Sequence, residues 1–222
     1  PPVSTLFPYT TLFRSATVDV VHKNGGVFIA DEVQPGFART GQAFFGFARH
    51  GIVPDMITMG KPMGNGIPIS GLAAKEDVLA AFSDKLPYFN TFGGNPVSIA
   101  AAQAVLKYIK DENLQEHCKK AGAALLKALK EVQERHPESV GDVRGAGLFL
   151  GFEFVKNDGN KTPDKDMALN VIEMLRDEHI LTSVIGHYGN ILKLRPPMVF
   201  SENDIDWFAT SLDKCITKLE NK

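Results

Sequence analysis

The sequence predicts an α/β fold, in which part of a mostly parallel sheet is followed by a smaller α+β domain. Two short runs, 27–30 and 55–59, are largely apolar, which is typical of strands buried on both faces. Helical patterns alternate with these runs up to about residue 135, as in parallel sheets with crossover helices. After His136 and Pro137 several short strand patterns follow, which indicates a second domain.

Local signals place the individual elements. Residues 114–135 carry apolar side chains at a spacing of three to four, and Pro96 suits the first turn of the preceding helix. Ser201 and Asp204 form a capping pattern, with serine at the N-cap and an acid at N3. We expect helices at 16–23, 76–82, 96–110, 114–135, 167–178 and after Ser201, and further strands at 71–74, 143–155, 180–185 and 191–194. The last helix should bury Ile205, Phe208, Leu212, Ile216 and Leu219.

The first fifteen residues are expected to be foreign to the protein. The chain opens with two prolines and no initiator Met, and residues 5–15 (TLFPYTTLFRS) match the conceptual translation of a common sequencing adapter. A genuine strand is the alternative, because Thr, Phe and Tyr favour strands. We therefore divide the chain into a non-native segment 1–15, a large-domain part 16–112 and a small domain 113–222, and we expect an N-terminally truncated fragment.

Composition excludes several classes of protein. The 24 Lys and Arg and 26 Asp and Glu residues are interspersed and give a net charge of −2, which argues against a nucleic-acid partner. No apolar run approaches the ~18 residues of a membrane span. Cys118 and Cys215 match no metal-site spacing, so we expect no metal and a reduced compartment. We expect the cytoplasm, with organellar targeting left open.

The candidate catalytic side chains lie where two predicted strands end. Asp31 and Glu32 follow the first strand, and Lys61 follows the second in the setting TMGKPMGNG. Open α/β sheets bind ligands at the carboxyl ends of their strands, so Asp31 and Lys61 should face one crevice. There a desolvated lysine becomes a nucleophile and a buried Asp needs a cationic partner, as pyridoxal phosphate requires. From the residues alone, a turn-capping Asp31 and a solvated Lys61 remain the alternative.

Three sequence blocks narrow this choice. They are residues 27–41 (VFIADEVQPGFARTG), 54–66 (PDMITMGKPMGNG) and 90–96 (NTFGGNP). In order and near spacing they resemble the class III pyridoxal-phosphate-dependent aminotransferases of fold type I, in particular the branch with ethanolamine-phosphate phospho-lyase-like proteins. The resemblance extends over essentially all of 16–222, through KLRPPM at 193–198.

The resemblance implies a role for each matched residue. Asp31 pairs with the cofactor's pyridine nitrogen, Val33 packs on one ring face, and Gln34 lies near the phenolic oxygen. Lys61 is the Schiff-base lysine and then moves a proton as general base and acid. Thr91 binds the cofactor phosphate of the neighbouring subunit, which implies a homodimer or a higher homo-oligomer.

Other positions are less clear. Arg195 is expected to bind a substrate carboxylate, with a surface arginine as the alternative. Ala38 stands where the family usually has glycine, which puts that turn in doubt if it needs a positive φ. The family is about twice as long, so we expect the phosphate loop, a stacking aromatic and a substrate-pocket glutamate to be missing.

The resemblance leaves three functions open. The first is a transaminase that moves an amino group from a donor to a 2-oxo acid. The second is a phospho-lyase acting on a phosphorylated amine, which Ile67 disfavours because that branch often has His there. The third is a non-catalytic fragment, against which the intact Asp31, Lys61 and Thr91 argue. The donor and the acceptor cannot be identified from these residues.

Overall fold

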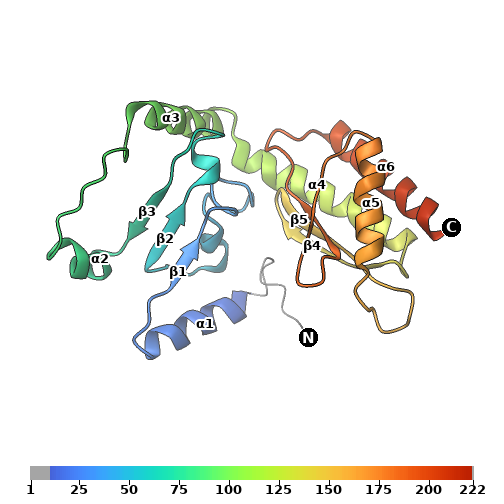
Figure 1. The fold of residues 1–222 in the computed structure, drawn as a ribbon, viewed down its shortest axis with the longest axis horizontal. Coiled ribbons are helices and arrows are strands. Elements are labelled where there is room, and N and C mark those ends of the chain that lie inside the picture. Colours follow the sequence, from blue (N-terminus) through green and yellow to red (C-terminus); the bar gives the residue numbers. More distant parts are fainter. Residues whose placement is uncertain (1–10, 222) are drawn as a thin grey trace. The chain divides into compact units, whose positions relative to one another are not determined.

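The computed structural model describes residues 11–221, which divide between Glu116 and His117 into two compact units (Figure 1). We call residues 11–116 the N-terminal unit and 117–221 the C-terminal unit. Of the segment 1–15 that we expect to be foreign to the protein, residues 1–10 lie outside the described residues. Residues 11–15 belong to a helix rather than to the alternative strand.

The N-terminal unit is a three-stranded sheet with helices. Its elements are α1 (Thr11–Lys23), β1 (Ile29–Asp31), η1 (Gly46–His50), β2 (Met56–Met59), η2 (Lys61–Met63), β3 (Gly71–Ala74), α2 (Glu76–Ser83) and α3 (Pro96–Asp111). The strand order is β1-β2-β3. β1 runs parallel to β2, with Asp31 opposite Thr58, and β3 runs antiparallel to β2. The predicted parallel pair is therefore present, and the third strand makes the sheet mixed.

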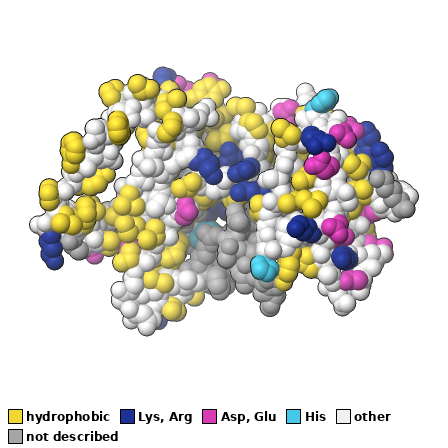
Figure 2. Space-filling view, viewed as in Figure 1, with side chains coloured by type: hydrophobic (Ala, Val, Ile, Leu, Met, Phe, Trp, Pro, Cys, Tyr) yellow, Lys and Arg dark blue, Asp and Glu magenta, His cyan; other side chains and the backbone are white. Residues whose placement is uncertain are grey.

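The sequence predicts that the apolar runs 27–30 and 55–59 are buried on both faces, and neither is. Met56–Met59 of the second run are all half-buried, and the first run is more exposed. Val27 and Ile29 are 48% and 52% exposed, and only Ala30 is buried. The reason is that β1 lies at the edge of the sheet and pairs with β2 alone among the described strands. Further apolar side chains gather over α2, α3 and the segment between them (Figure 2), where Leu86, Tyr88, Phe89 and Phe92 are each more than half exposed.

A buried carboxylate holds this unit together. Asp55 precedes β2, and its Oδ2 accepts a hydrogen bond from the Phe28 N–H at 2.7 Å. His22 Nε2 of α1 lies 2.7 Å from the same oxygen, and Lys75 Nζ lies 2.8 Å from Oδ1. The hydrogen bond from Lys75, followed by those from the Phe28 N–H and His22, holds the pKa of Asp55 well below its ordinary value of 3.8. Asp55 thus joins a helix to three strand ends.

Asp55→Asn should destabilise the chain by about 1–3 kcal/mol at pH 7, because charged hydrogen bonds to a buried group are lost. A carboxyl whose pKa is lowered on folding contributes stability above its unfolded pKa and loses it as the pH falls. The difference between the two proteins should therefore shrink below about pH 4. Denaturant unfolding at pH 7 and pH 3 measures it, with the exposed Asp84→Asn as control. A difference that stays constant between the two pH values contradicts the assignment.

The C-terminal unit is an antiparallel sheet covered by helices. Its elements are most of α4 (Leu114–Arg135), then β4 (Val140–Ala146), β5 (Phe149–Phe154), α5 (Lys165–Asp177), β6 (Val184–Ile185), β7 (Ile191–Leu194) and α6 (Glu202–Glu220). The strand order is β4-β5-β7-β6. Phe152 and Phe154 are fully buried and pack edge to face at 5.3 Å. The predicted capping box at Ser201 and Asp204 is confirmed, and α6 buries four of the five predicted residues, with Leu219 partly buried.

Two strand predictions in this unit are wrong. The run 143–155 is not one strand but the hairpin β4–β5, because Gly147 adopts a φ of +52° and turns the chain. The run 180–185 forms only the two-residue strand β6, whose partner is β7. Apolar content alone reveals neither the turn at Gly147 nor the short length of β6.

Gly122→Ala should destabilise the C-terminal unit although alanine favours helices. An alanine Cβ at this position of α4 would lie 2.3 Å from the carbonyl carbon and oxygen of Gly147. Helix propensity favours alanine by about 1 kcal/mol. Overpacking against backbone outweighs it, so we expect a net loss of about 2 kcal/mol. Denaturant unfolding of this variant and of the exposed control Lys130→Ala decides, and a stabilised Gly122→Ala protein contradicts this packing.

The described part of the chain contains no group of three or more His, Cys, Asp or Glu side chains placed to hold a metal ion. Within residues 11–221, no helix has the length and apolar character needed to cross a membrane.

Candidate active site

The carboxyl ends of β1 and β2 bring the predicted site residues together. Asp31 is the last residue of β1, and Lys61 follows β2 after one residue and opens η2. Parallel pairing places both ends at the same edge of the sheet. Lys61 Nζ donates a hydrogen bond to Gln34 Oε1 at 3.4 Å, so the segment after β1 meets the segment after β2.

The Asp31 carboxylate is held by one of its two oxygens. Oδ1 accepts hydrogen bonds from the Val33 N–H at 3.0 Å and from Thr58 Oγ1 at 3.4 Å. Among the described residues, no hydrogen bond is recorded for Oδ2. Thr58 was not singled out from the sequence, although its register opposite Asp31 is the signal that identifies it. The arrangement fixes the carboxylate and leaves an oxygen for a ligand.

Val33 supplies the apolar surface of the site. Its side chain is half-buried, and its Cγ2 methyl lies 3.9 Å from where a Cβ on Gly60 would stand. The methyl therefore faces the backbone just before Lys61. Lys61 itself has a φ of +24°, which L residues rarely adopt. A strained backbone thus presents the amine.

The predicted burial of the two charged residues is not found. Asp31 and Lys61 are both exposed in this chain. Within the described residues, the Asp31 carboxylate accepts hydrogen bonds from the Val33 N–H and Thr58, and Lys61 donates one to Gln34, and both side chains remain exposed. The desolvated lysine expected from the sequence is therefore not a property of these residues by themselves.

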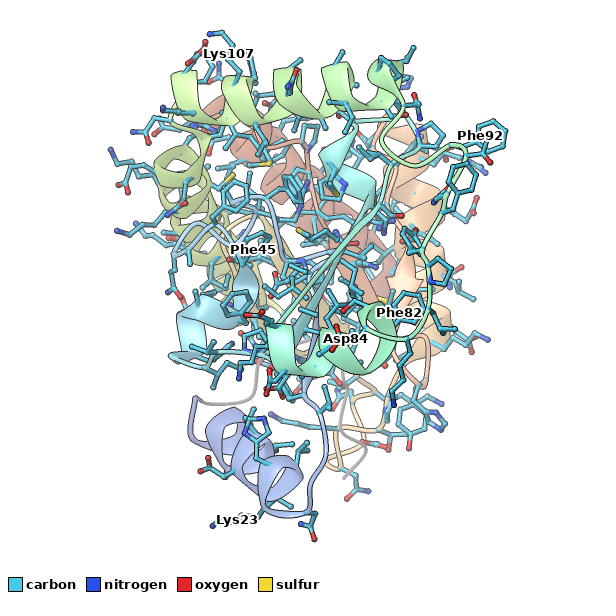
Figure 3. All side chains as sticks on the ribbon, turned by 90° about the vertical axis from the view of Figure 1, so that its left-hand side faces the viewer. Lys23, Phe45, Phe82, Asp84, Phe92 and Lys107 are labelled. Atoms are coloured by element: carbon cyan, nitrogen blue, oxygen red, sulfur yellow. The ribbon has the colours of Figure 1, made fainter. Side chains whose placement is uncertain are left out.

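Thr91 lies on a separate turn of the same unit. Asn90 Oδ1 accepts hydrogen bonds from the N–H groups of Phe92 and Gly93, at 3.1 and 2.9 Å, and so shapes the turn. The Phe92 ring projects outward from this loop (Figure 3) and is 81% exposed. Thr91 makes no recorded hydrogen bond to Asp31 or Lys61 within the described residues, so the structure does not bring it into their group.

The turn is nevertheless tied to the loop that follows Lys61. Asn95 caps α3 by accepting from the Ser98 N–H at 3.0 Å. Ser98 Oγ then donates to the carbonyl of Pro68 at 3.0 Å. Neither Asn90 nor Ser98 was singled out from the sequence. Both signals were available, since Asn90 opens the NTFGGNP block and Ser98 follows it by two residues.

Arg195 belongs to the C-terminal unit. It is exposed and comes directly after the last residue of β7. With Lys193, Leu181 and Trp207 it lines a cavity of about 470 Å³. Two cations and an indole lining one cavity suit a ligand with a negative charge and an apolar part. Arg195 and the Asp31–Lys61 group belong to different units.

The groups at the strand ends fit pyridoxal phosphate by their chemistry. Asp31 offers a carboxylate oxygen for a protonated ring nitrogen, and Lys61 offers a primary amine for the aldehyde. Gln34 offers an amide beside that amine, and Val33 offers a methyl surface for a ring face. Each group that the ring requires on this side has a counterpart among four residues.

Comparisons with known proteins agree with this chemistry. Residues 6–216 match the family model described as Aminotransferase class-III. Ethanolamine-phosphate phospho-lyase homolog 1 of Caenorhabditis elegans is 44% identical over 89% of this chain and 43% of its own length. Alanine–glyoxylate aminotransferase 2 homolog 2, mitochondrial, of Arabidopsis thaliana is 41% identical over 93% of this chain and 43% of its own.

Solved structures show the same fold. A phospholyase from Arthrobacter in complex with phosphoethanolamine has a TM-score of 0.89 and 38% identity, over 92% of this chain and 48% of that chain. A transaminase from the marine bacterium Virgibacillus has a TM-score of 0.87 and 30% identity, over 95% of this chain and 49% of that chain. The chain thus spans less than half the length of the relatives it matches.

Proposed function

We propose, because this chain belongs to the class III aminotransferase family, that it forms the C-terminal half of a transaminase. The fold is part of fold type I, and pyridoxal 5′-phosphate is the cofactor of the family. The observation that carries the proposal is the meeting of Asp31, Gln34 and Lys61 at the ends of two parallel strands. The reaction proposed is amino transfer from a donor to a 2-oxo acid.

The mechanism assigns one task to each residue at the strand ends. When bound, pyridoxal phosphate supplies an electron sink for the charge left when a substrate carbon loses its proton. Asp31 holds a proton on the ring nitrogen, and Thr58 and the Val33 N–H keep its carboxylate in place. Lys61 would hold the cofactor's aldehyde through Nζ, and its amine would take and return the substrate proton. Val33 covers a ring face and excludes water from it.

Two further assignments complete the proposal. Thr91 donates its hydroxyl and N–H to the cofactor phosphate of a second copy, which makes a homodimer the smallest active assembly. The exposed apolar side chains around that turn suit such an interface. Arg195 binds a substrate carboxylate. We place the enzyme in the cytoplasm, and the mitochondrial relative from Arabidopsis thaliana supports the organelle as the alternative.

A phospho-lyase is the second candidate. It is supported by the 44% identical relative from Caenorhabditis elegans and by the Arthrobacter phospholyase bound to phosphoethanolamine. Ile67, where that branch often has His, supports the transaminase instead. Because Asp31 and Lys61 serve both reactions, the residues at the strand ends do not separate them.

One assay distinguishes the candidates. The product of the complete open reading frame that encodes this chain is incubated with phosphoethanolamine, with and without a 2-oxo acid. A transaminase forms a new amino acid only when the acceptor is present. Release of inorganic phosphate without acceptor identifies a phospho-lyase and overturns the first proposal. No reaction, with a panel of amino donors as well, overturns both.

The 222-residue chain alone should bind the cofactor weakly and show no measurable turnover. The reason is that Asp31 and Lys61 are exposed, so the described residues alone do not shield a bound cofactor from water. Titration with pyridoxal phosphate, followed by absorbance, measures this. A stable absorbance band near the visible range at stoichiometric cofactor contradicts the proposal.

A further inference from the structure

Glu32 is a buried carboxylate beside the site to which the proposed mechanism gives no task. It directly follows Asp31 and is 2% exposed. Its Oε2 accepts a hydrogen bond from the Gly46 N–H at 2.7 Å, and its Oε1 accepts one from the Phe47 N–H at 2.8 Å. These two N–H groups open η1. We call Glu32, Gly46 and Phe47 the Glu32 clamp.

The backbone of Glu32 is also fixed on both sides. Its N–H donates to the carbonyl of Thr58 at 2.9 Å, and its carbonyl accepts from the Gly36 N–H at 3.1 Å. Thr58 lies on β2, the strand that leads to Lys61. Glu32 therefore joins the end of β1, the end of β2 and the loop 33–45 at a single residue.

The loop that the clamp closes is conformationally unfavourable. Phe37 and Ala38 have φ values of +59° and +66°, in the left-handed region that L residues avoid. Ala38, where the family usually has glycine, therefore occupies a turn position that does need a positive φ. The Ala38 N–H donates to the carbonyl of Phe44 at 2.9 Å, and the Phe37 and Phe44 rings pack at 5.3 Å. Such a backbone persists only where its surroundings hold it.

We propose that Glu32 is a positioning residue for the cofactor site, acting through the loop that it clamps. Val33 and Gln34 immediately follow Glu32, and Gln34 accepts the hydrogen bond from Lys61. An ionised carboxylate accepts from both N–H groups at once, whereas a carboxamide offers a single acceptor and turns an NH₂ group toward the second. This role rests on the proposed function of Asp31 and Lys61 and adds a residue to it.

Gly46 gives a second way to open the clamp. An alanine Cβ at Gly46 would lie 2.7 Å from Pro35 Cβ and 3.3 Å from Glu32 Oε2. Gly46→Ala thus disturbs the clamp from the loop side and leaves the carboxylate in place. Glu76 is exposed in the first turn of α2, so Glu76→Gln is a matched control for the loss of one carboxylate.

The experiment compares Glu32→Gln, Gly46→Ala and Glu76→Gln with the unmodified protein, each made as the complete open reading frame product. Hydrogen exchange of the peptide that spans 44–50 reports the clamp without cofactor. We expect it to be about tenfold faster or more in the two clamp variants, because a charged hydrogen bond is lost. The dissociation constant for pyridoxal phosphate should rise by a similar factor, and the pH dependence of the bound cofactor's absorbance should shift.

The outcomes separate the clamp from the function. Faster exchange together with weaker cofactor binding and a shifted pH profile, absent from Glu76→Gln, supports the proposal. Faster exchange with cofactor binding and pH profile like those of Glu76→Gln overturns the positioning role. Unchanged exchange in both clamp variants overturns the clamp itself. An unmodified protein that does not attach the cofactor overturns the proposed function, and the role of Glu32 in the site with it.

Discussion

Replacing Lys61 by arginine is expected to abolish turnover of the complete enzyme, with kcat reduced by at least about 10⁴-fold. Arginine keeps the positive charge, but its guanidinium is not a nucleophile at neutral pH and cannot accept the substrate proton. Lys61 is exposed and makes one hydrogen bond of 3.4 Å within the described residues, so its loss should leave the free energy of unfolding nearly unchanged. Steady-state kinetics and denaturant unfolding on the same preparation measure the two effects.

Two further variants make this expectation specific. Lys85→Arg changes an exposed lysine of the same unit and should retain full activity. Lys61→Ala should regain part of its activity when a small primary amine is added, because the amine supplies the missing proton acceptor. Activity of Lys61→Arg within tenfold of the unmodified enzyme contradicts the role of Lys61.

Replacing Asp31 by asparagine is expected to lower kcat by about 10²-fold or more, since one fixed charge at the reacting group is removed. The amide oxygen can still accept from the Val33 N–H and from Thr58, so the local fold is kept. It cannot keep a proton on a ring nitrogen, and the electron sink weakens. Cofactor attachment to Lys61 should therefore persist while turnover falls, which absorbance and kinetics measure separately.

Asp84→Asn is the matched control, because Asp84 is an exposed carboxylate of the same unit (Figure 3). It should leave both cofactor attachment and turnover unchanged. An Asp31→Asn protein that turns over as fast as this control means that Asp31 does not face the ring nitrogen.

The sequence predicts best those elements whose signals are local. The helix 114–135 has the predicted bounds, and the capping box of Ser201 and Asp204 forms, because neighbouring residues specify both. The run 143–155 fails because its turn depends on a positive φ at Gly147 that an apolar pattern does not encode. Burial of 27–30 fails because burial depends on which segments cover a strand, and no pattern within the strand reports that.

The site residues, like the elements of the fold, divide into those with local sequence signals and those without. Asp31 and Lys61 are recognisable because each follows a strand, and parallel pairing then brings the strand ends together. Glu32 is not recognisable in this way, since its partners lie 14 and 15 residues further along the chain. Its neighbour Asp31 carries the same carboxylate group but is exposed, whereas Glu32 is buried. The two residues differ in the direction of their side chains and in the loop that Glu32 contacts, and the sequence shows neither.

The most direct test of the account is to find the lysine that binds pyridoxal phosphate. The complete open reading frame product is incubated with the cofactor, reduced with borohydride, digested and examined by mass spectrometry. The account predicts a reduced cofactor adduct on the peptide that carries Lys61, and on no other lysine in proportion to the protein. An adduct on a different lysine, such as Lys75, or no adduct at all contradicts the central claim that the ends of β1 and β2 form the cofactor site.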